Sequence, residues 1–158
     1  MDSDCLVKLT KAGAKEIVGN VIEIYIPNLV KKETVDEGRE SGFQDALIIM
    51  ENIDKKILQV AKHGKKNTSL IPATKGEMEA VSHYLEGDYD AIASDDRKFL
   101  KRLESANIPF LTPAACVIYV FERGGIKKHT ALELLNNLKN LISNEEYTIA
   151  KMVVEGMP

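Results

Sequence analysis

Carboxylates recur at four places along the chain, each after an apolar, strand-like segment or near the start of a helix-like one. They are Asp2 (with Asp4 close by), Glu33, Glu79 and the adjacent pair Asp95 and Asp96. Two neighbouring carboxylates at a strand end repel each other when both are ionised, and a cation removes that cost. Oxygen ligands of this kind suit Mg²⁺ or Mn²⁺. Ions held in this way bind phosphodiesters and lower the pKa of an attacking water, so the pattern favours phosphodiester hydrolysis.

Each of these acids also has an ordinary structural explanation. Asp2, and either Asp95 or Asp96, could cap a helix. Glu33 sits in a highly charged stretch that is typical of a solvated helix face, and Glu79 alone is more often an exposed helix residue. The prediction of a site therefore depends on four positions recurring in order. One member of the Asp95–Asp96 pair is expected to cap a helix and the other to be free.

The histidines and cysteines do not form a metal-binding pattern. His63, His83 and His129 are scattered, which argues against zinc. Cys5 and Cys116 lie far apart and outside any Cys-x-x-Cys pair, so we expect buried, reduced thiols. Neither a signal peptide nor an apolar run of bilayer length is visible. Together these features predict a soluble, cytoplasmic protein with no membrane partner.

Length and charge restrict the fold and the partners. The chain has 158 residues, 44% of them hydrophobic, and a net charge of −3, which fits a single domain spanning residues 1–158. A protein that coats nucleic acid is usually strongly basic. The composition therefore disfavours broad binding to a nucleic-acid backbone but allows a local basic rim around an acidic site.

Two clusters of cations could supply such a rim, although a solvated surface is the simpler explanation for both. The first contains Lys55, Lys56, Lys62, Lys65 and Lys66, and the second contains Arg97, Lys98, Lys101 and Arg102. The second cluster begins one residue after Asp96. Arg97, Lys98 and Lys101 are therefore the predicted contacts to phosphates beside a scissile one.

The elements that must position these side chains alternate between strand and helix. Strands are predicted at 21–26, 57–60, 89–93 and 108–111, and helices at 28–39, 43–53, 75–85, 96–105, 114–122, 130–141 and 144–154. This alternation predicts an α/β fold, a three-layer α/β/α arrangement with a mainly parallel central sheet and a helical C-terminal part from about residue 113. In such sheets ligands bind at the carboxyl ends of the strands, which is where the acids fall.

Four segments resemble, in order, the motifs of the PIN-domain family, in particular a prokaryotic branch related to the toxins of toxin–antitoxin pairs. They are Asp2–Val7, Ile26–Glu33, Gly76–Val81 and Ser94–Phe99, and the stretch Glu37–Ile49 is also similar to that branch. The resemblance covers about Asp2 to Gly125. An alternative register that uses Asp90 in the third motif is rejected, because Asp90 lies too close to Asp95 for a helix and a strand to intervene.

The resemblance implies a metal-dependent nuclease that acts on RNA and uses Mg²⁺ or Mn²⁺. Carried over by position, the catalytic acids are Asp2, Glu33, Glu79 and Asp96, and the metal ligands are the same four together with Asp95. Ser3 would support Asp2 by a hydrogen bond. The resemblance also implies an antitoxin as a partner and allows a homodimer; the apolar stripe from Leu132 to Ile142 is expected to be core or dimer surface.

Two departures from the family pattern leave alternatives open. A strand precedes the first Asp in the family, whereas only Met1 precedes Asp2 here, which predicts either a start further upstream or a sheet without its usual first strand. Glu79 stands where many members have Asp, although it keeps the oxygen ligand. One alternative is a non-catalytic PIN-like protein that binds a partner. Another is a phosphatase resembling the haloacid dehalogenases, with Asp2 as nucleophile and Asp4 two residues on.

Overall fold

The computed structural model describes residues 1–61, 74–87 and 89–157. Its helices are α1 (Ser3–Lys11), α2 (Lys15–Gly19), α3 (Asn28–Lys31), the π-helical segment η1 (Lys32–Glu37), α4 (Gly38–Glu40), α5 (Gln44–Asp54), α6 (Lys75–Glu86), α7 (Arg97–Ser105), α8 (Pro113–Glu122), α9 (Lys128–Leu138) and α10 (Asn144–Gly156). Its strands are β1 (Ile24–Ile26), β2 (Leu58–Val60), β3 (Ile92–Ala93) and β4 (Phe110–Leu111). The predicted α/β class with parallel strands is confirmed.

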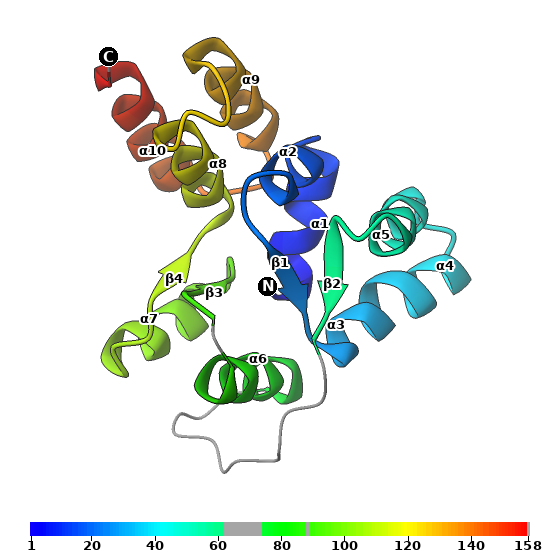
Figure 1. Cartoon of the computed structure of the whole chain (residues 1–158). Helices are drawn as coiled ribbons and strands as arrows, with labels where there is room; N and C mark the ends of the chain where they lie inside the picture. Colours follow the sequence, from blue (N-terminus) through cyan, green and yellow to red (C-terminus); the bar gives the residue numbers. More distant parts are fainter. Residues whose placement is uncertain (62–73, 88, 158) are drawn as a thin grey trace.

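The described strands form two parallel pairs, β1 with β2 and β3 with β4 (Figure 1). Their registers are Ile24–Leu58, Tyr25–Gln59, Ile26–Val60, Ile92–Phe110 and Ala93–Leu111. The N-terminal residues lie between the two pairs. The Met1 amino group donates to the Tyr25 carbonyl at 2.8 Å, and the Asp2 amide donates to the Ala93 carbonyl at 2.9 Å. These two residues join the pairs at the position that a central strand would have in a continuous sheet.

The predicted helix after the first strand is continuous but not uniform. Pro27 ends β1 and precedes the first turn of α3, where its fixed φ and missing N–H do no harm. α3 then runs through the wider turns of η1 into α4. Gly42 follows with φ +75°, a conformation that favours glycine, and reverses the chain into α5.

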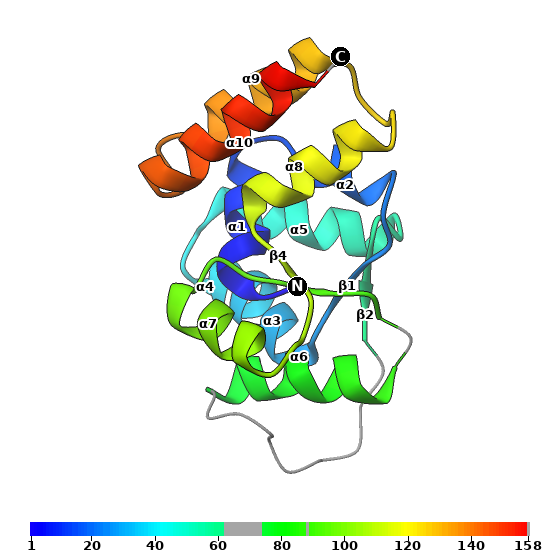
Figure 2. The ribbon, with the colours of Figure 1, turned by 90° about the vertical axis from the view of Figure 1, so that its left-hand side faces the viewer.

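The core is mainly aliphatic and has a large and a small part. The large part gathers buried side chains from α1, β1, α5 and the three C-terminal helices, and the small part lies between α6, β3 and α7. Leu135 and Leu138, from the apolar stripe on α9, are fully buried, so that stripe is core. Figures 1 and 2 show α8, α9 and α10 at one end of the molecule and α6 at the opposite end.

Two helices near the N-terminus were not predicted. α1 begins directly after Asp2 and buries Cys5, Leu6 and Leu9, which share one face of a helix. α2 is short and buries Lys15 and Val18. The capping Asp and the helical spacing of the apolar residues were the signals that could have revealed α1.

Candidate active site

Asp2 places a carboxylate between the carboxyl ends of β1 and β3. Its Oδ1 caps α1 by accepting a hydrogen bond from the Cys5 amide at 2.9 Å. Burial raises the pKa of the Asp2 carboxyl, and a hydrogen bond from Ser94 opposes that rise. Sequence reasoning missed Ser94, which is fully buried directly after β3. It is the hydroxyl that supports Asp2.

Glu33 is brought to the same edge through Ser3. The Ser3 hydroxyl donates to Glu33 Oε2 at 2.6 Å, although the two residues are 30 positions apart. The expectation that Ser3 bonds to Asp2 is therefore corrected, since its hydroxyl bonds to Glu33. Glu33 itself is exposed on the first turn of η1, so its carboxylate faces solvent next to the start of α1.

Asp95 lies inside the site and is paired with a cation. Its side chain is 12% exposed, and its carboxylate forms an ion pair with the ammonium of Lys8. Lys8 also bonds to Asp4 at 2.6 Å, one turn away on α1. Burial lowers the pKa of Lys8, but its hydrogen bonds to Asp4 and Asp95 outweigh burial and the net pKa is raised. Lys8 thus neutralises part of the negative charge that the sequence places here.

Asp96 has a different role from its neighbour. It caps α7, because its Oδ1 accepts from the amides of Lys98 and Phe99, both at 2.8 Å. Its own amide donates to Ser94 Oγ at 3.1 Å. The expectation that one of the two aspartates caps a helix is confirmed. The other, Asp95, is not free, because Lys8 binds it.

Replacing Asp96 with Ala is expected to lower the free energy of unfolding by about 1 kcal/mol, because two amides of α7 lose their acceptor. Asp96→Asn should cost only a small part of that, since Asn caps helices about as well as Asp. Urea unfolding of the two variants checks this. Equal losses in both would show that the charge of Asp96, and not its capping oxygen, stabilises the fold.

Glu79 fixes the helix start that leads to Glu33. Its two carboxylate oxygens accept from the amides of Asn28 and Leu29 at 3.2 and 3.1 Å, at the beginning of α3. The imidazole of His83 lies 3.8 Å from Glu79 Oε1. A carboxylate at a helix N-terminus is also favoured by the helix dipole. Glu79 therefore connects α6 to the carboxyl end of β1.

Glu146 on α10 is a further acid that sequence reasoning missed. It accepts a hydrogen bond from the Ala114 amide at 3.0 Å at the start of α8. Burial raises the pKa of Glu146; hydrogen bonds from Ala114 and Thr112 oppose the rise, and the nearby Asp95 adds to it. The only local signal was Ser143 three residues earlier, which indicates a helix start and says nothing of Asp95.

The cations that follow the acidic pair lie on the surface of α7. Arg97, Lys98 and Lys101 are exposed, and Arg97 lies 3.9 Å from Glu145. Arg102, by contrast, bonds to Glu77 at 2.8 Å. Of the other basic cluster, Lys62, Lys65 and Lys66 lie outside the described residues, as does His63.

The order of these acids along the chain can be compared with known families. A family model described as DUF3368, a PIN domain, matches residues 1–154. The chain belongs to the PIN-domain family. Comparisons with curated proteins and with solved structures gave no match. A PIN domain has a nuclease-type fold, and PIN domains generally use divalent metal ions. Membership therefore favours the nuclease expectation over the phosphatase-like one.

The oxygen donors of this PIN domain fit a hard divalent ion by their chemistry. Each of three acids has its own partner in this structure: Asp2 has Ser94, Glu33 has Ser3, and Asp95 has Lys8. Within residues 1–61, 74–87 and 89–157, no three His, Cys, Asp or Glu side chains are close enough together to hold an ion. Metal binding to this arrangement would therefore require carboxylates to exchange their present partners.

The cysteines of the PIN domain agree with a simpler expectation. Cys5 and Cys116 are free and fully buried, and a hydrogen bond between them together with burial raises the pKa of Cys5 well above its usual value. In the described part of the chain no helix is long and apolar enough to span a bilayer.

Proposed function

We propose that this PIN domain is a metal-dependent ribonuclease that hydrolyses RNA phosphodiester bonds with Mg²⁺ or Mn²⁺. The observation that supports this best is that Asp2 and Asp95 both lie at the carboxyl end of β3. Asp2 is hydrogen-bonded to the last residue of β3, and Asp95 lies two residues after that strand end. That is the edge where parallel sheets bind their ligands.

In this proposal Asp2, Glu33 and Asp95 hold the ion. Glu79 and Asp96, which sequence reasoning placed among the ligands, act as positioning residues, because their oxygens bind the first amides of α3 and α7. The ion would supply charge stabilisation for the phosphodiester and a lower pKa for the attacking water.

Several side chains of the domain would act on the substrate or the acids directly. Arg97, Lys98 and Lys101 are exposed and lie one to five residues after Asp96, so they would bind phosphates of the RNA on either side of the scissile one. Lys8 holds the Asp95 carboxylate in place through their ion pair. Ser94 opposes the rise in the pKa of Asp2 that burial causes, which favours the ionised form that binds metal.

A non-catalytic PIN domain that binds a partner is the second candidate function. The observation in its favour is that no three metal-binding side chains are gathered among the described residues.

A toxin role with an antitoxin as partner would extend the ribonuclease proposal. A cytoplasmic location for the ribonuclease agrees with the two free thiols.

Calorimetric titration with Mn²⁺ tests the proposal and separates the two candidates. We expect Asp2→Asn to weaken Mn²⁺ binding at least tenfold, which corresponds to about 1.4 kcal/mol, because a charged ligand is lost while Asn still caps α1. Glu133→Gln on α9 is the matched control, since Glu133 is exposed at the other end of the molecule. Cleavage of fluorescent single-stranded RNA in Mn²⁺ should likewise be weakened by Asp2→Asn and unchanged by Glu133→Gln. Absence of Mn²⁺ binding by the unmodified protein would favour the non-catalytic candidate.

A further inference from the structure

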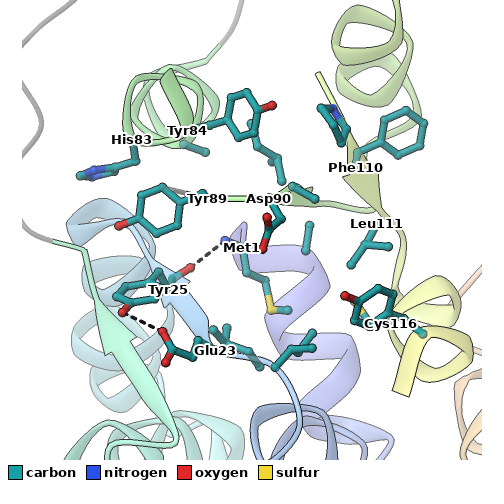
Figure 3. Close-up of a pocket in the computed structure, with 18 of the residues that line it drawn as sticks. Met1, Glu23, Tyr25, His83, Tyr84, Tyr89, Asp90, Phe110, Leu111 and Cys116 are labelled. Carbon is teal, nitrogen blue, oxygen red and sulfur yellow. Dashed lines mark hydrogen bonds between the residues drawn. The ribbon is translucent and has the colours of Figure 1, made fainter. Parts of the chain in front are cut away.

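Three charged side chains from distant parts of the sequence form one network beside the proposed metal site. The ammonium of Lys8 on α1 forms an ion pair with Asp4, one turn earlier, at 2.6 Å, and a second ion pair with Asp95, 87 positions later. A cavity of about 570 Å³ lies between the two pairs of strands, and its walls include Met1 and Tyr25 (Figure 3). None of the three charged residues lines it, so the network is separate from that cavity.

The two partners of Lys8 differ in their contact with solvent. The side chain of Asp95 is 12% exposed and that of Lys8 is 20% exposed, whereas the side chain of Asp4 is 57% exposed. Lys8 thus connects an inner carboxylate to an outer one. Its four-carbon stem has several rotatable bonds, so the ammonium can leave the inner carboxylate while it stays bound to the outer one.

Asp95 differs from the other two proposed ligands in the charge of its partner. Asp2 and Glu33 are each hydrogen-bonded to a serine hydroxyl, which adds no net charge to the site. Lys8, by contrast, places a positive charge against Asp95. At equal distance a divalent ion attracts a carboxylate about twice as strongly as an ammonium does, and it repels the ammonium. A divalent ion and the Lys8 ammonium therefore compete for Asp95.

We propose that Lys8 regulates the metal site as an internal cation, and that its ammonium moves from Asp95 to Asp4 when a divalent ion binds Asp95. This inference rests on the ribonuclease proposed above, whose ion Asp95 would hold. Asp4 gains a role that needs its charge, because it keeps the displaced ammonium on α1. Only the arrangement in which Asp95 is released binds the ion, so the ammonium lowers the apparent affinity of the site.

Calorimetric titration with Mn²⁺ tests the competition. Lys8→Met is expected to bind Mn²⁺ about tenfold or more tightly than the unmodified protein, because no ammonium competes for Asp95. Lys11→Met is the matched control, since it removes an exposed charge from the same helix and should change the affinity by less than about twofold. Asp4→Asn should weaken binding about fivefold in the unmodified background and have no effect in the Lys8→Met background, because the two residues act together.

The NMR signal of the Lys8 ammonium in ¹⁵N-labelled protein reports the exchange without any change to the site. We expect this signal to shift as Mg²⁺ is added and to remain visible, because Asp4 still binds the ammonium. In Asp4→Asn the signal should instead disappear when Mg²⁺ binds, because an ammonium without a partner exchanges its protons with water. Lys8→Met identifies the signal by its absence, and urea unfolding checks that each variant folds.

The possible results separate this inference from the ribonuclease proposal. Equal or weaker Mn²⁺ binding by Lys8→Met, with a Lys8 signal that Mg²⁺ leaves in place, would contradict the exchange and leave the ribonuclease proposal intact. A gain in affinity that Lys11→Met shares, or an effect of Asp4→Asn that persists in the Lys8→Met background, would indicate a general effect of charge and would also overturn the exchange. Absence of Mn²⁺ binding in both the unmodified protein and Lys8→Met would overturn both proposals, whereas binding by Lys8→Met alone would support the exchange.

Discussion

Asp95→Asn is expected to reduce Mn²⁺-dependent RNA cleavage by about 100-fold or more, whereas Asp96→Asn is expected to retain most of it. The two variants should differ because the adjacent carboxylates of Asp95 and Asp96 have different partners in the structure. Asp95 is 12% exposed and carries its charge next to Lys8, with Glu146 close by. Asp96 uses its oxygen to cap α7, a role that Asn can take over. Single-turnover cleavage of one RNA substrate by both variants measures the difference.

Stability must be measured alongside this pair, because Asp95→Asn also removes an ion-pair partner from Lys8. Urea unfolding of both variants, together with Lys8→Met, shows whether lost activity merely reflects lost structure. A cleavage defect confined to Asp96→Asn, in a folded protein, would contradict the assignment of Asp95. It would restore the sequence-based choice of Asp96.

Lys15→Met is expected to stabilise the protein by about 1–3 kcal/mol at pH 7. Lys15 on α2 is 1% exposed, and its ammonium is buried without a hydrogen-bond partner in the part of the chain that the structure describes. Burial lowers the pKa of Lys15 from 10.5 to about 8. Met keeps most of the packing of the aliphatic stem and removes the buried charge.

The lowered pKa of Lys15 also predicts how the stability difference between the unmodified protein and Lys15→Met changes with pH. Below pH 8 Lys15 is protonated in both states, so the folded protein bears the full cost of the buried charge. Between about pH 8 and 10.5 the unfolded chain binds the extra proton, so the stability of the unmodified protein rises relative to Lys15→Met. The advantage of the variant should therefore shrink across this range in urea unfolding at pH 7 and 9.5. Lys11→Met, at an exposed position, should be neutral; destabilisation by Lys15→Met at pH 7 would contradict the explanation.

Local signals in the sequence were sufficient for much of the fold. The β-rich segment ending at Pro27 predicted β1, and the alternation of strands and helices predicted the parallel α/β class. The length of β1 was overestimated, because Val21 and Ile22 belong to a turn that shares the composition of a strand. Composition shows which residues favour extended backbone, while pairing with β2 decides which of them form the strand.

The partners of the site acids could not be predicted in the same way. Ser3 and Glu33 are 30 positions apart, and Lys8 and Asp95 are 87 apart, so no local pattern relates them. Capping was predictable for the Asp95–Asp96 pair, because it depends on the next three residues. Which of the two would cap depended on the exact end of β3. Glu146 was missed because its position near Asp95 arises only from the packing of α10.

The cap that Glu79 provides for α3 also has a consequence for the order of folding. Its carboxylate oxygens accept from amides 50 and 51 positions earlier in the chain, so the first turn of α3 gains this cap only after α6 has packed against it. Closing so long a loop is slow, since the entropy loss precedes the stabilising contact. During synthesis Lys8 likewise has no Asp95 to bind until most of the chain has left the ribosome. A protein built in this way would acquire its acidic edge among the last events of folding, and incomplete chains would lack it.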